Sequence, residues 1–173
     1  HNADDVCNKI NDNVCFVKQE EQLGTGHAVL SAIDYIKDEG NVLILYGDTP
    51  LITEETINLL LKYHDDNKLD VTVATMILDN PFGYGRIIKE DNKFKKIVEQ
   101  KDTTEEENLI KEVNTGIYCF NASALKLSLS KLNNNNNQNE YYLTDTIEIL
   151  LNNNYKIVTM LSYCCNDFYG INS

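Results

Sequence analysis

Short apolar runs of strand length alternate along this chain with longer segments in which apolar residues recur at helical spacing. This alternation restricts the fold more than any other feature, because it produces an α/β sheet with helices on both faces. At 173 residues, the chain has the length of one domain with a sizeable core. Strands are expected at 14–18, 41–46, 70–78, 86–90, 94–99, 113–120 and 156–162, and helices at 26–38, 53–66, 121–132 and 144–153.

Two segments interrupt the alternation. Residues 86–99 are expected to form a β-hairpin around Asp91 and Asn92, because this pair has turn-forming residues between two apolar runs. Residues 103–108 are rich in Thr and Glu and are expected to form a short acidic helix or lid. The sheet is therefore expected to carry a small insertion.

A glycine-containing loop covers Gln22 to Ala28, in which Gly24 and Gly26 flank Thr25. A backbone without Cβ atoms can lie flat against a flat or anionic ligand. The strand expected just upstream would place the loop at a strand's carboxyl end, where open α/β sheets bind ligands. Taken alone, the motif fits a plain tight turn as well as it fits a nucleotide site.

A second candidate site follows the apolar run that ends in Tyr46, Gly47 and Asp48. A parallel sheet presents its ligands at this end of a strand. Mg²⁺ is usually bound through one or two protein oxygens together with substrate phosphates, so Asp48 beside a nucleotide loop would be sufficient. In the structural alternative, Asp48 caps the turn into the helix expected near Thr53.

The chain is strongly acidic, with 27 Asp and Glu against 15 Lys and Arg, a net charge of -12 and a pI near 4.6. This balance argues against nucleic acid or an anionic membrane surface as a partner. The apolar runs are also too short for insertion into a bilayer. A nucleotide ligand would need Mg²⁺ to neutralise its phosphates, or basic residues supplied from elsewhere.

The five cysteines show no Cys-x-x-Cys spacing and no pairing with histidine that would indicate zinc. An odd count without a signal peptide favours a reducing cytoplasm. Cys15 and Cys119 lie in apolar runs and are expected to be core thiols. No role is assigned to the adjacent Cys164 and Cys165.

Seven blocks occur in a fixed order: Gln19 through Ala28, Tyr46-Gly47-Asp48, Gly83-Tyr84-Gly85-Arg86-Ile87, Val98-Glu99-Gln100-Lys101-Asp102, Asn114-Thr115-Gly116, Glu140-Tyr141-Tyr142-Leu143-Thr144-Asp145 and Gly170-Ile171-Asn172. In this order they resemble the blocks of bacterial N-acetylglucosamine-1-phosphate uridylyltransferases. The resemblance runs from about Gln19 to the last residue. The Glu-Tyr-Tyr-Leu-Thr-Asp block after an Asn-rich loop is more specific than the glycine loops.

The resemblance implies a Rossmann-like nucleotidyltransferase sheet whose β-hairpin insertion lies at the sugar pocket. The implied reaction joins UTP and N-acetylglucosamine 1-phosphate into UDP-N-acetylglucosamine and pyrophosphate, for cell-wall precursor synthesis. Such enzymes are usually bifunctional, with a carboxy-terminal β-helix acetyltransferase domain through which the full-length protein would form a homotrimer.

The resemblance also implies roles for individual residues in substrate binding. The uracil would be read by Gln19, Gln22, Gly24 and Thr25. Tyr46 and Gly47 would contact substrate, and Asp48 and Asn172 would hold Mg²⁺, with Asp48 the catalytic ligand. The sugar pocket would be lined by Gly85, Glu99, Asn114, Tyr142 and Thr144.

The chain also departs from the family pattern. It lacks the Leu-x-x-Gly-x-Gly-Thr-Arg-Met segment with its following Pro-Lys, and it ends before any hexapeptide repeat. Residues 1–173 are therefore interpreted as a partial nucleotidyltransferase domain that is inactive alone. Arg86 and Lys101, the basic residues inside the blocks, are expected to pair with carboxylates such as Asp102. Asn139 replaces a family Gly, and Asn also tolerates a left-handed backbone.

The histidines and the Asn-rich segment are given structural roles. In uridylyl transfer the attacking group is already an oxyanion, so His27 is expected to pack or cap at a helix start and not to act as a base. His64 is expected to be solvated near a helix end. Residues 133–137 are interpreted as a solvated surface loop. Thr144 is a candidate helix N-cap. This structural role accounts for the threonine but gives no reason for the nearby Tyr142.

Two other functions are compatible with the sequence. The same scaffold could act on another sugar 1-phosphate after a few changes in the pocket. Alternatively, the chain could be a nucleotide-binding module without catalytic activity, serving assembly or regulation. An assay of several sugar phosphates would separate the first alternative from the main interpretation.

Overall fold

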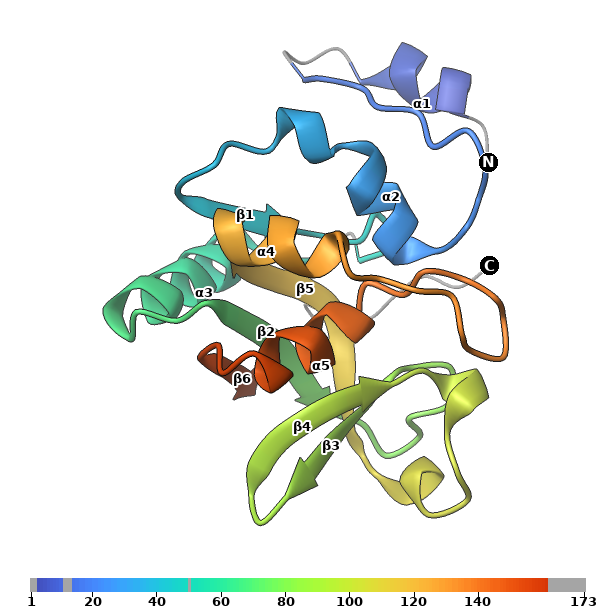
Figure 1. The fold of residues 1–173 in the computed structure, drawn as a ribbon, viewed down its shortest axis with the longest axis vertical. Coiled ribbons are helices and arrows are strands. Elements are labelled where there is room, and N and C mark those ends of the chain that lie inside the picture. Colours follow the sequence, from blue (N-terminus) through green and yellow to red (C-terminus); the bar gives the residue numbers. More distant parts are fainter. Residues whose placement is uncertain (1–2, 11–13, 50, 162–173) are drawn as a thin grey trace.

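A computed structural model describes residues 3–10, 14–49 and 51–161. Within this part of the chain, six strands form one sheet in the order β4-β3-β5-β2-β6, and β1 pairs with the opposite end of β5 from β3 (Figure 1). The strands are β1 (Asn41–Ile44), β2 (Val71–Ile77), β3 (Arg86–Glu90), β4 (Lys93–Val98), β5 (Glu112–Asn121) and β6 (Ile157–Leu161). All of them correspond to predicted strands, with ends that differ by at most a few residues.

The sheet is mixed, so the prediction of a ligand at the carboxyl end of a parallel strand does not apply to most of its strands. β5 runs antiparallel to β1, β2 and β3, whereas β2 and β6 are parallel. Apolar runs show that a strand is buried on both faces, but they carry no information about its direction. The predicted site after β1 consequently lies beside an antiparallel neighbour.

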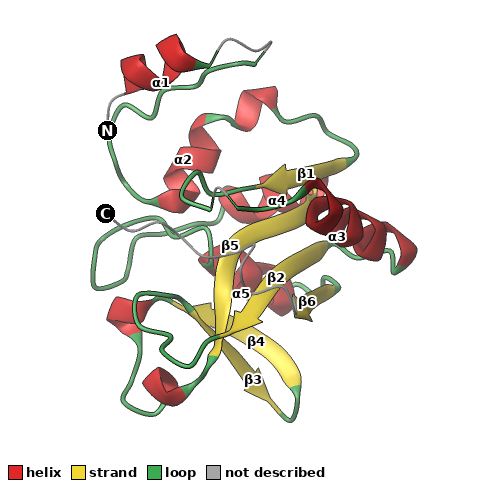
Figure 2. Ribbon diagram, turned by 180° about the vertical axis from the view of Figure 1, so that it is seen from behind, coloured by secondary structure: helices red, strands yellow, loops and turns green. Residues whose placement is uncertain are grey.

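Helices cover both faces of the sheet, as predicted. The described α-helices are α1 (Ala3–Lys9), α2 (Thr25–Ser31), α3 (Glu54–Asp66), α4 (Ala122–Leu129) and α5 (Asp145–Asn152). Short 3₁₀ helices are η1 (Ile33–Tyr35), η2 (Gln100–Asp102) and η3 (Glu107–Leu109). α4 and α5 pack on one face and α3 on the other, as the two opposite views show (Figure 2). No helix in the described part of the chain has the length and apolar character to cross a membrane.

Two hydrophobic clusters separate along β2 and β5 according to the alternation of side chains across a strand. The first contains Val71, Val73, Tyr118 and Phe120 with Leu125, Leu129, Ile147 and Leu150 of α4 and α5. The second contains Ala74, Met76, Ile117 and Cys119 with Leu60 of α3. Cys119 is thus a core thiol, as predicted.

The predicted strand at 14–18 was wrong, because these residues form no strand. Val14 and Phe16 are 51% and 46% exposed, and the Cys15 thiol is also exposed and not in the core. A run of apolar residues this short does not distinguish a buried strand from an extended segment. The glycine loop therefore follows an irregular segment and not a strand's carboxyl end.

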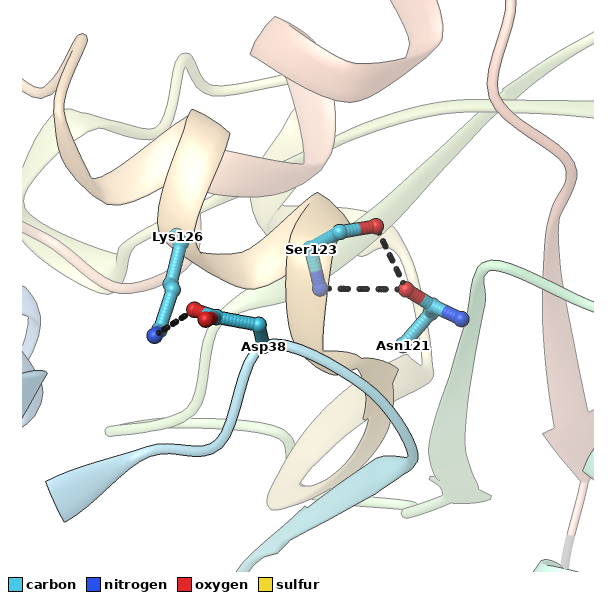
Figure 3. Close-up of polar contacts among 4 residues, drawn as sticks. All are labelled: Asp38, Asn121, Ser123 and Lys126. Atoms are coloured by element: carbon cyan, nitrogen blue, oxygen red, sulfur yellow. Dashed lines mark hydrogen bonds and ion pairs between the residues drawn. The ribbon is translucent and has the colours of Figure 1, made fainter.

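The segment between α2 and β1 is attached to α4 by polar contacts (Figure 3). The predicted helix 26–38 is shorter, ending at Ser31 and followed by η1. Lys126 of α4 forms an ion pair with Asp38 at 2.6 Å. Asn121 caps the start of α4 by accepting hydrogen bonds from the Ser123 backbone N and Oγ at 3.1 and 2.7 Å.

The predicted hairpin is formed by β3 and β4, which pair antiparallel around Asp91 and Asn92. Both turn residues have positive φ, 48° and 60°, as a two-residue turn of the I′ kind requires. In the predicted acidic segment, Thr104 and Glu107 cap each other through backbone-to-side-chain hydrogen bonds of 2.9 and 3.2 Å. That segment is a capped turn leading into η3.

The expectation of a solvated His64 was wrong. The side chain is 2% exposed, and its Nδ1 lies 2.9 Å from Thr72 Oγ1 on β2. Burial lowers the pKa of His64 and favours the neutral ring. The histidine joins α3 to the sheet, a contact that helical position alone did not reveal.

Candidate functional site

A cavity of about 210 Å³ lies where the loops after β1 and before β3 meet the middle of β5. Its lining comes from the start of α2, the segment after β1, the segments flanking the hairpin, the middle of β5 and the loop before α5. The lining residues are Thr25, Tyr46, Asp48, Thr49, Gly83, Tyr84, Gly85, Glu99, Asn114, Thr115, Gly116, Gln138, Glu140 and Tyr142. Segments that are far apart in sequence thus converge on one concave site.

The middle of β5 contains a bulge at the cavity. Val73 of β2 pairs with Tyr118 and Thr75 pairs with Asn114, so β5 advances four residues while β2 advances two. Gly116 within the bulge has a φ of 78°. Thr115 Oγ1 donates a hydrogen bond of 2.8 Å to the carbonyl of Ala74, inside the stretch of β2 where the register shifts. Bulges often redirect side chains at functional sites.

Gly116 is required by a close approach of the Tyr46 ring. A Cβ at this position would lie 2.5 Å from Tyr46 Cδ2. The ring therefore covers the bare backbone of the bulge, and Tyr118 packs behind it with ring centroids 6.4 Å apart. Burial raises the pKa of Tyr46 to about 12, so the hydroxyl stays protonated.

Asn114 is held in a fixed orientation at this wall. Its Nδ2 donates a hydrogen bond of 2.6 Å to Tyr118 Oη, and its Oδ1 accepts one of 3.2 Å from the Gly116 backbone N. Both ends of the amide are thus engaged from the protein side. The remaining lone pair of Oδ1 and the second N–H of Nδ2 can still serve a ligand.

The glycine loop packs directly on the block before α5. Gly26 N donates to Tyr141 O at 2.8 Å, and Tyr141 N donates to Leu23 O at 2.7 Å. A Cβ on Gly24 would lie 2.7 Å from Tyr141 O, and Gly24 has a φ of 107°. The glycines are therefore explained by contact with the chain itself. Thr25 lines the cavity, while its Oγ1 accepts a hydrogen bond from Leu143 N at 3.0 Å.

Gln19 braces this loop from outside the cavity lining. Its Nε2 donates to Gly24 O at 3.1 Å and lies 2.9 Å from His27 Nδ1. The His27 ring also lies against Tyr141, with centroids 6.2 Å apart. His27 thus has the packing role expected at the helix start. The cavity lining includes neither Gln19, Gln22, Gly24 nor Gly47.

Asp48 lines the cavity with an exposed carboxylate. The alternative that it caps the following helix was wrong, because Thr53 is the N-cap of α3 and accepts from Thr56 N at 3.2 Å. No hydrogen bond or ion pair joins Asp48 to another described residue. The carboxylate is therefore available for a cation or a ligand.

Glu99 is a partly buried carboxylate at the end of the hairpin. Its Oε1 accepts a hydrogen bond of 2.9 Å from Thr144 Oγ1. Burial, and then the nearby charges of Asp102 and Glu140, raise the pKa of Glu99. Gly85 leaves room beside it, since a Cβ there would lie 3.5 Å from Glu99 Oε2. Glu99 thus presents one oxygen to the cavity.

Thr144 is the N-cap residue of α5, as predicted, but its side chain does not cap the helix. Its backbone is already helical, with φ -59° and ψ -28°, and it makes no capping hydrogen bond. An N-cap residue needs an extended backbone to reach the free N–H groups of the first turn. Its hydroxyl instead serves Glu99, and it does not itself line the cavity.

The Asn-rich segment is exposed for the most part, but it is also fixed to η2. Asn137 donates from its backbone N to Asp102 Oδ1 and from its Nδ2 to Lys101 O, both at 3.0 Å. Asn139 has a φ of 55°, the left-handed backbone expected where the family has Gly. The interpretation as a merely solvated loop was therefore incomplete.

The expected pairing of Arg86 and Lys101 with carboxylates was wrong. Arg86 is 1% exposed and donates to the Tyr84 carbonyl and to Gln100 Oε1, the latter at 2.8 Å. Lys101 donates to Gln138 Oε1. Side-chain amides and carbonyls offer oxygen acceptors without the second charge, an alternative that residue charge alone does not reveal.

Among the described residues, no three His, Cys, Asp or Glu side chains group closely enough to hold a metal ion alone. Asp48 is the candidate ligand that lines the cavity. Asn172, the other predicted ligand, and Cys164 and Cys165 lie outside the described residues, as does the block 170–172. A shared Asp48 and Asn172 site stays a prediction.

A mixed sheet covered by helices on both faces, with a cavity lined by its loops, defines an α/β domain with a candidate ligand site. A sequence model of the family described as Nucleotidyl transferase matches residues 5–164, so the chain belongs to this family. It is 49% identical over 174 residues to the Bifunctional protein GlmU of Acetivibrio thermocellus, covering 99% of this chain and 38% of that protein. It is 48% identical to the protein of the same name from Clostridioides difficile, covering 100% of this chain and 38% of that protein. The chain thus spans 38% of the length of these relatives.

Solved structures show the same fold. The crystal structure of UDP-glucose pyrophosphorylase complexed with UDP-glucose matches with a TM-score of 0.66 and 19% sequence identity, covering 85% of this chain and 57% of that one. At this identity the likeness establishes the architecture. It agrees with the α/β nucleotidyltransferase fold expected from the sequence.

Several lining residues were not singled out from the sequence. They are Thr49, Gly83, Tyr84, Thr115, Gly116, Gln138 and Glu140. Most belong to the recognised blocks or adjoin them, and a glycine inside a strand signals a bulge. Gln138 gave no such signal, because it stands at the end of the Asn-rich run.

Proposed function

We propose that the protein carrying this sequence transfers a uridylyl group from UTP to N-acetylglucosamine 1-phosphate, forming UDP-N-acetylglucosamine and pyrophosphate. One observation carries this proposal: the motif blocks after β1, before β3, after β4, within β5 and before α5 all reach a single cavity. The relatives named GlmU, at 48% and 49% identity, support the same assignment. The proposed location is the cytoplasm.

The sugar phosphate needs no general base, because its attacking oxygen is already an anion. The side chains of the cavity would therefore act by alignment. Glu99 has one oxygen committed to Thr144, which leaves the other to accept from a sugar hydroxyl or amide. Asn114, anchored by Tyr118, would supply an additional donor or acceptor. Fixed groups of this kind lower the barrier by holding reactants in line.

Thr25 and the backbone around Gly24 would face the uracil ring. The loop is held by its hydrogen bonds to Tyr141 and by the brace of Gln19, so its backbone groups are preorganised. A site built to pair with one base edge rejects another base because its buried groups would go unpaired. The preference for uracil over another base would thus depend on how firmly the glycine loop is held in place.

The cavity offers one oxygen ligand of the kind that Mg²⁺ binds, the carboxylate of Asp48. Asp48 offers a carboxylate that no described residue engages, and Mg²⁺ commonly takes one protein carboxylate together with phosphate oxygens and water. Asn172 would be the second protein ligand. When bound, the ion would neutralise charge on the transferring phosphate.

The test is an assay of pyrophosphate release by a full-length protein that carries this sequence, with UTP, Mg²⁺ and a series of sugar 1-phosphates. We expect N-acetylglucosamine 1-phosphate to give the highest kcat/KM. A clear preference for glucose 1-phosphate would assign a different substrate to the same reaction. Binding of UTP without turnover of any sugar phosphate would contradict the proposal.

Residues 1–173 by themselves are expected to release no pyrophosphate. Phosphoryl transfer needs cations or backbone donors around the equatorial oxygens. Arg86 and Lys101 are both engaged by oxygens of the protein, so neither is free for the phosphates. Robust Mg²⁺-dependent release by this segment would show that the phosphate site has been misplaced.

A further inference from the structure

Gln138 connects a cation to a cavity hydroxyl. Its Oε1 accepts a hydrogen bond from Lys101 Nζ, and its Nε2 donates one of 2.6 Å to Tyr142 Oη. Gln138 and Tyr142 both line the cavity, and Tyr142 is 5% exposed. The three side chains therefore form a continuous polar path from the turn after β4 to the cavity.

The direction of this path is fixed by chemistry. An ammonium group has no acceptor, so the amide atom that faces Lys101 must be the oxygen. The NH₂ group of Gln138 must then face Tyr142, whose oxygen accepts. The proton of the Tyr142 hydroxyl is consequently left to be donated to another acceptor. Lys101 thus determines which way the Tyr142 hydroxyl points.

The surroundings keep that hydroxyl in its protonated, donating form. Burial, with a further contribution from the adjacent Asp102 carboxylate, raises the pKa of Tyr142 to about 12. Asp102 Oδ2 is itself buried and has no hydrogen-bond partner among the described residues. The hydroxyl is therefore protonated at neutral pH, and Gln138 holds it where Tyr142 lines the cavity.

The backbone of Gln138 is fixed as well. Asn136 Oδ1 accepts from the backbone N of both Gln138 and Glu140 at 3.2 Å. Asn137 holds the loop to Asp102 and Lys101. Both attachments keep the amide within reach of Tyr142, so its position does not depend on the side-chain bonds alone.

We propose that Gln138 is a positioning residue for the Tyr142 hydroxyl, oriented by Lys101, and that this path sets the affinity for the sugar 1-phosphate but not for UTP. The inference rests on the proposed function, in which Tyr142 faces the sugar. Tyr142 lies two residues from Thr144, the partner of Glu99, whereas Asp48 belongs to the segment after β1. Loss of Gln138 should therefore affect one substrate and spare the other.

The experiment compares Gln138→Met, Lys101→Met and the control Asn135→Ala in a full-length protein that carries this sequence. Met is close to Gln in size but cannot donate to Tyr142. We expect the KM for N-acetylglucosamine 1-phosphate to rise about fivefold in Gln138→Met, the effect of one hydrogen bond, with the KM for UTP unchanged. Lys101→Met, which frees the amide to rotate, should give a smaller rise. The control, whose side chain makes no described polar contact, should give none.

A double-variant cycle tests whether Gln138 acts through Tyr142. In a Tyr142→Phe background, Gln138→Met should cause no further rise in the sugar phosphate KM, because the acceptor is already absent. An unchanged KM in Gln138→Met, an equal rise for both substrates, or additive effects in the cycle would overturn the proposal. If Gln138→Met does not fold, the same cycle is measured with Lys101→Met in place of Gln138→Met, and the same outcomes support or overturn the proposal. An inactive parent protein would instead contradict the proposed function.

Discussion

The strand wall of the cavity, formed by Asn114, Thr115 and Gly116 of β5, and its loop wall, formed by the lining residues outside the strands, are held in place differently. The strand wall belongs to the core of the sheet and is shaped by a bulge and by close packing against Tyr46. The loop wall is held by hydrogen bonds between polar side chains, such as Gln138 with Tyr142. Substitution in the strand wall should therefore reduce stability. Substitution in the loop wall should change substrate handling with little loss of stability.

The largest expected effect tests the loop wall. Asp48→Ala should lower kcat on the order of a thousandfold, because the site loses the carboxylate proposed to hold Mg²⁺. The urea midpoint should stay at the wild-type value, since the carboxylate makes no described contact. Asp79→Ala, an exposed carboxylate paired with Lys111 outside the cavity, is the matched control and should keep its activity. Normal turnover by Asp48→Ala at ordinary Mg²⁺ would remove it from the metal site.

The second prediction tests the strand wall. Gly116→Ala should lower the free energy of unfolding by about 2–4 kcal/mol, since the new Cβ meets the Tyr46 ring and the backbone has positive φ. Gly40→Ala separates the two causes, because Gly40 has a φ of 96° but nothing within 4 Å of an added Cβ. Urea denaturation of the control should show a loss of about 1–2 kcal/mol. Equal losses in both variants would mean that packing against Tyr46 contributes nothing.

The third prediction concerns the carboxylate of Asp145, the first residue of α5. Burial, and then the charge of Glu148, raises the pKa of Asp145 to about 6. Because the folded pKa is raised, the wild type has its full stability below the unfolded value near pH 4 and loses part of it as the pH rises through about 6.

Asp145→Asn removes this titration. Relative to the wild type, the variant should gain about 1–2 kcal/mol between pH 4 and pH 8, a value discounted for partial exposure. Urea denaturation at both pH values measures the difference. A constant difference between the two proteins would show that Asp145 ionises normally in the folded state.

The smallest effect is expected at the brace of the glycine loop. Gln19→Ala should raise the KM for UTP about fivefold and narrow the preference over CTP, because the loop loses one support outside the cavity. Lys18→Ala removes an exposed neighbour that pairs with Glu20 and should change neither value. An unchanged ratio of UTP to CTP would show that Gln19 has no part in base selection.

Features encoded locally were the ones predicted well from the sequence. The hairpin was anticipated because Asp91 and Asn92 suit a turn with positive φ, and β3 has the expected bounds. The two faces of β2 and β5 follow from alternation of apolar residues. The family blocks identified seven of the lining residues by type and order.

What the sequence did not reveal depends on contacts between distant segments. His64 is buried because Thr72 on β2 meets it, and helical position alone does not show this. Val14 and Phe16 are apolar but pair with no strand edge. The side chain of Gln138 is oriented by Lys101, 37 positions away in the sequence. No local pattern shows this contact, so the neighbouring Asn-rich run was interpreted as a solvated loop. The direction of each strand relative to its neighbour likewise depends on which distant segments pair, and no local pattern shows this.

The pairing of the glycine loop with Tyr141 has a consequence for the order of folding. Thr25 and Leu143 are 118 positions apart, whereas the hairpin closes over two turn residues. Loop-closure entropy delays contacts between remote segments, so the hairpin and the local helices should form first. The glycine loop can reach its final position only after β5 and the block before α5 are in place. The glycine loop would therefore be among the last parts of the molecule to assemble, and its amides should gain protection from exchange later than those of the hairpin during refolding.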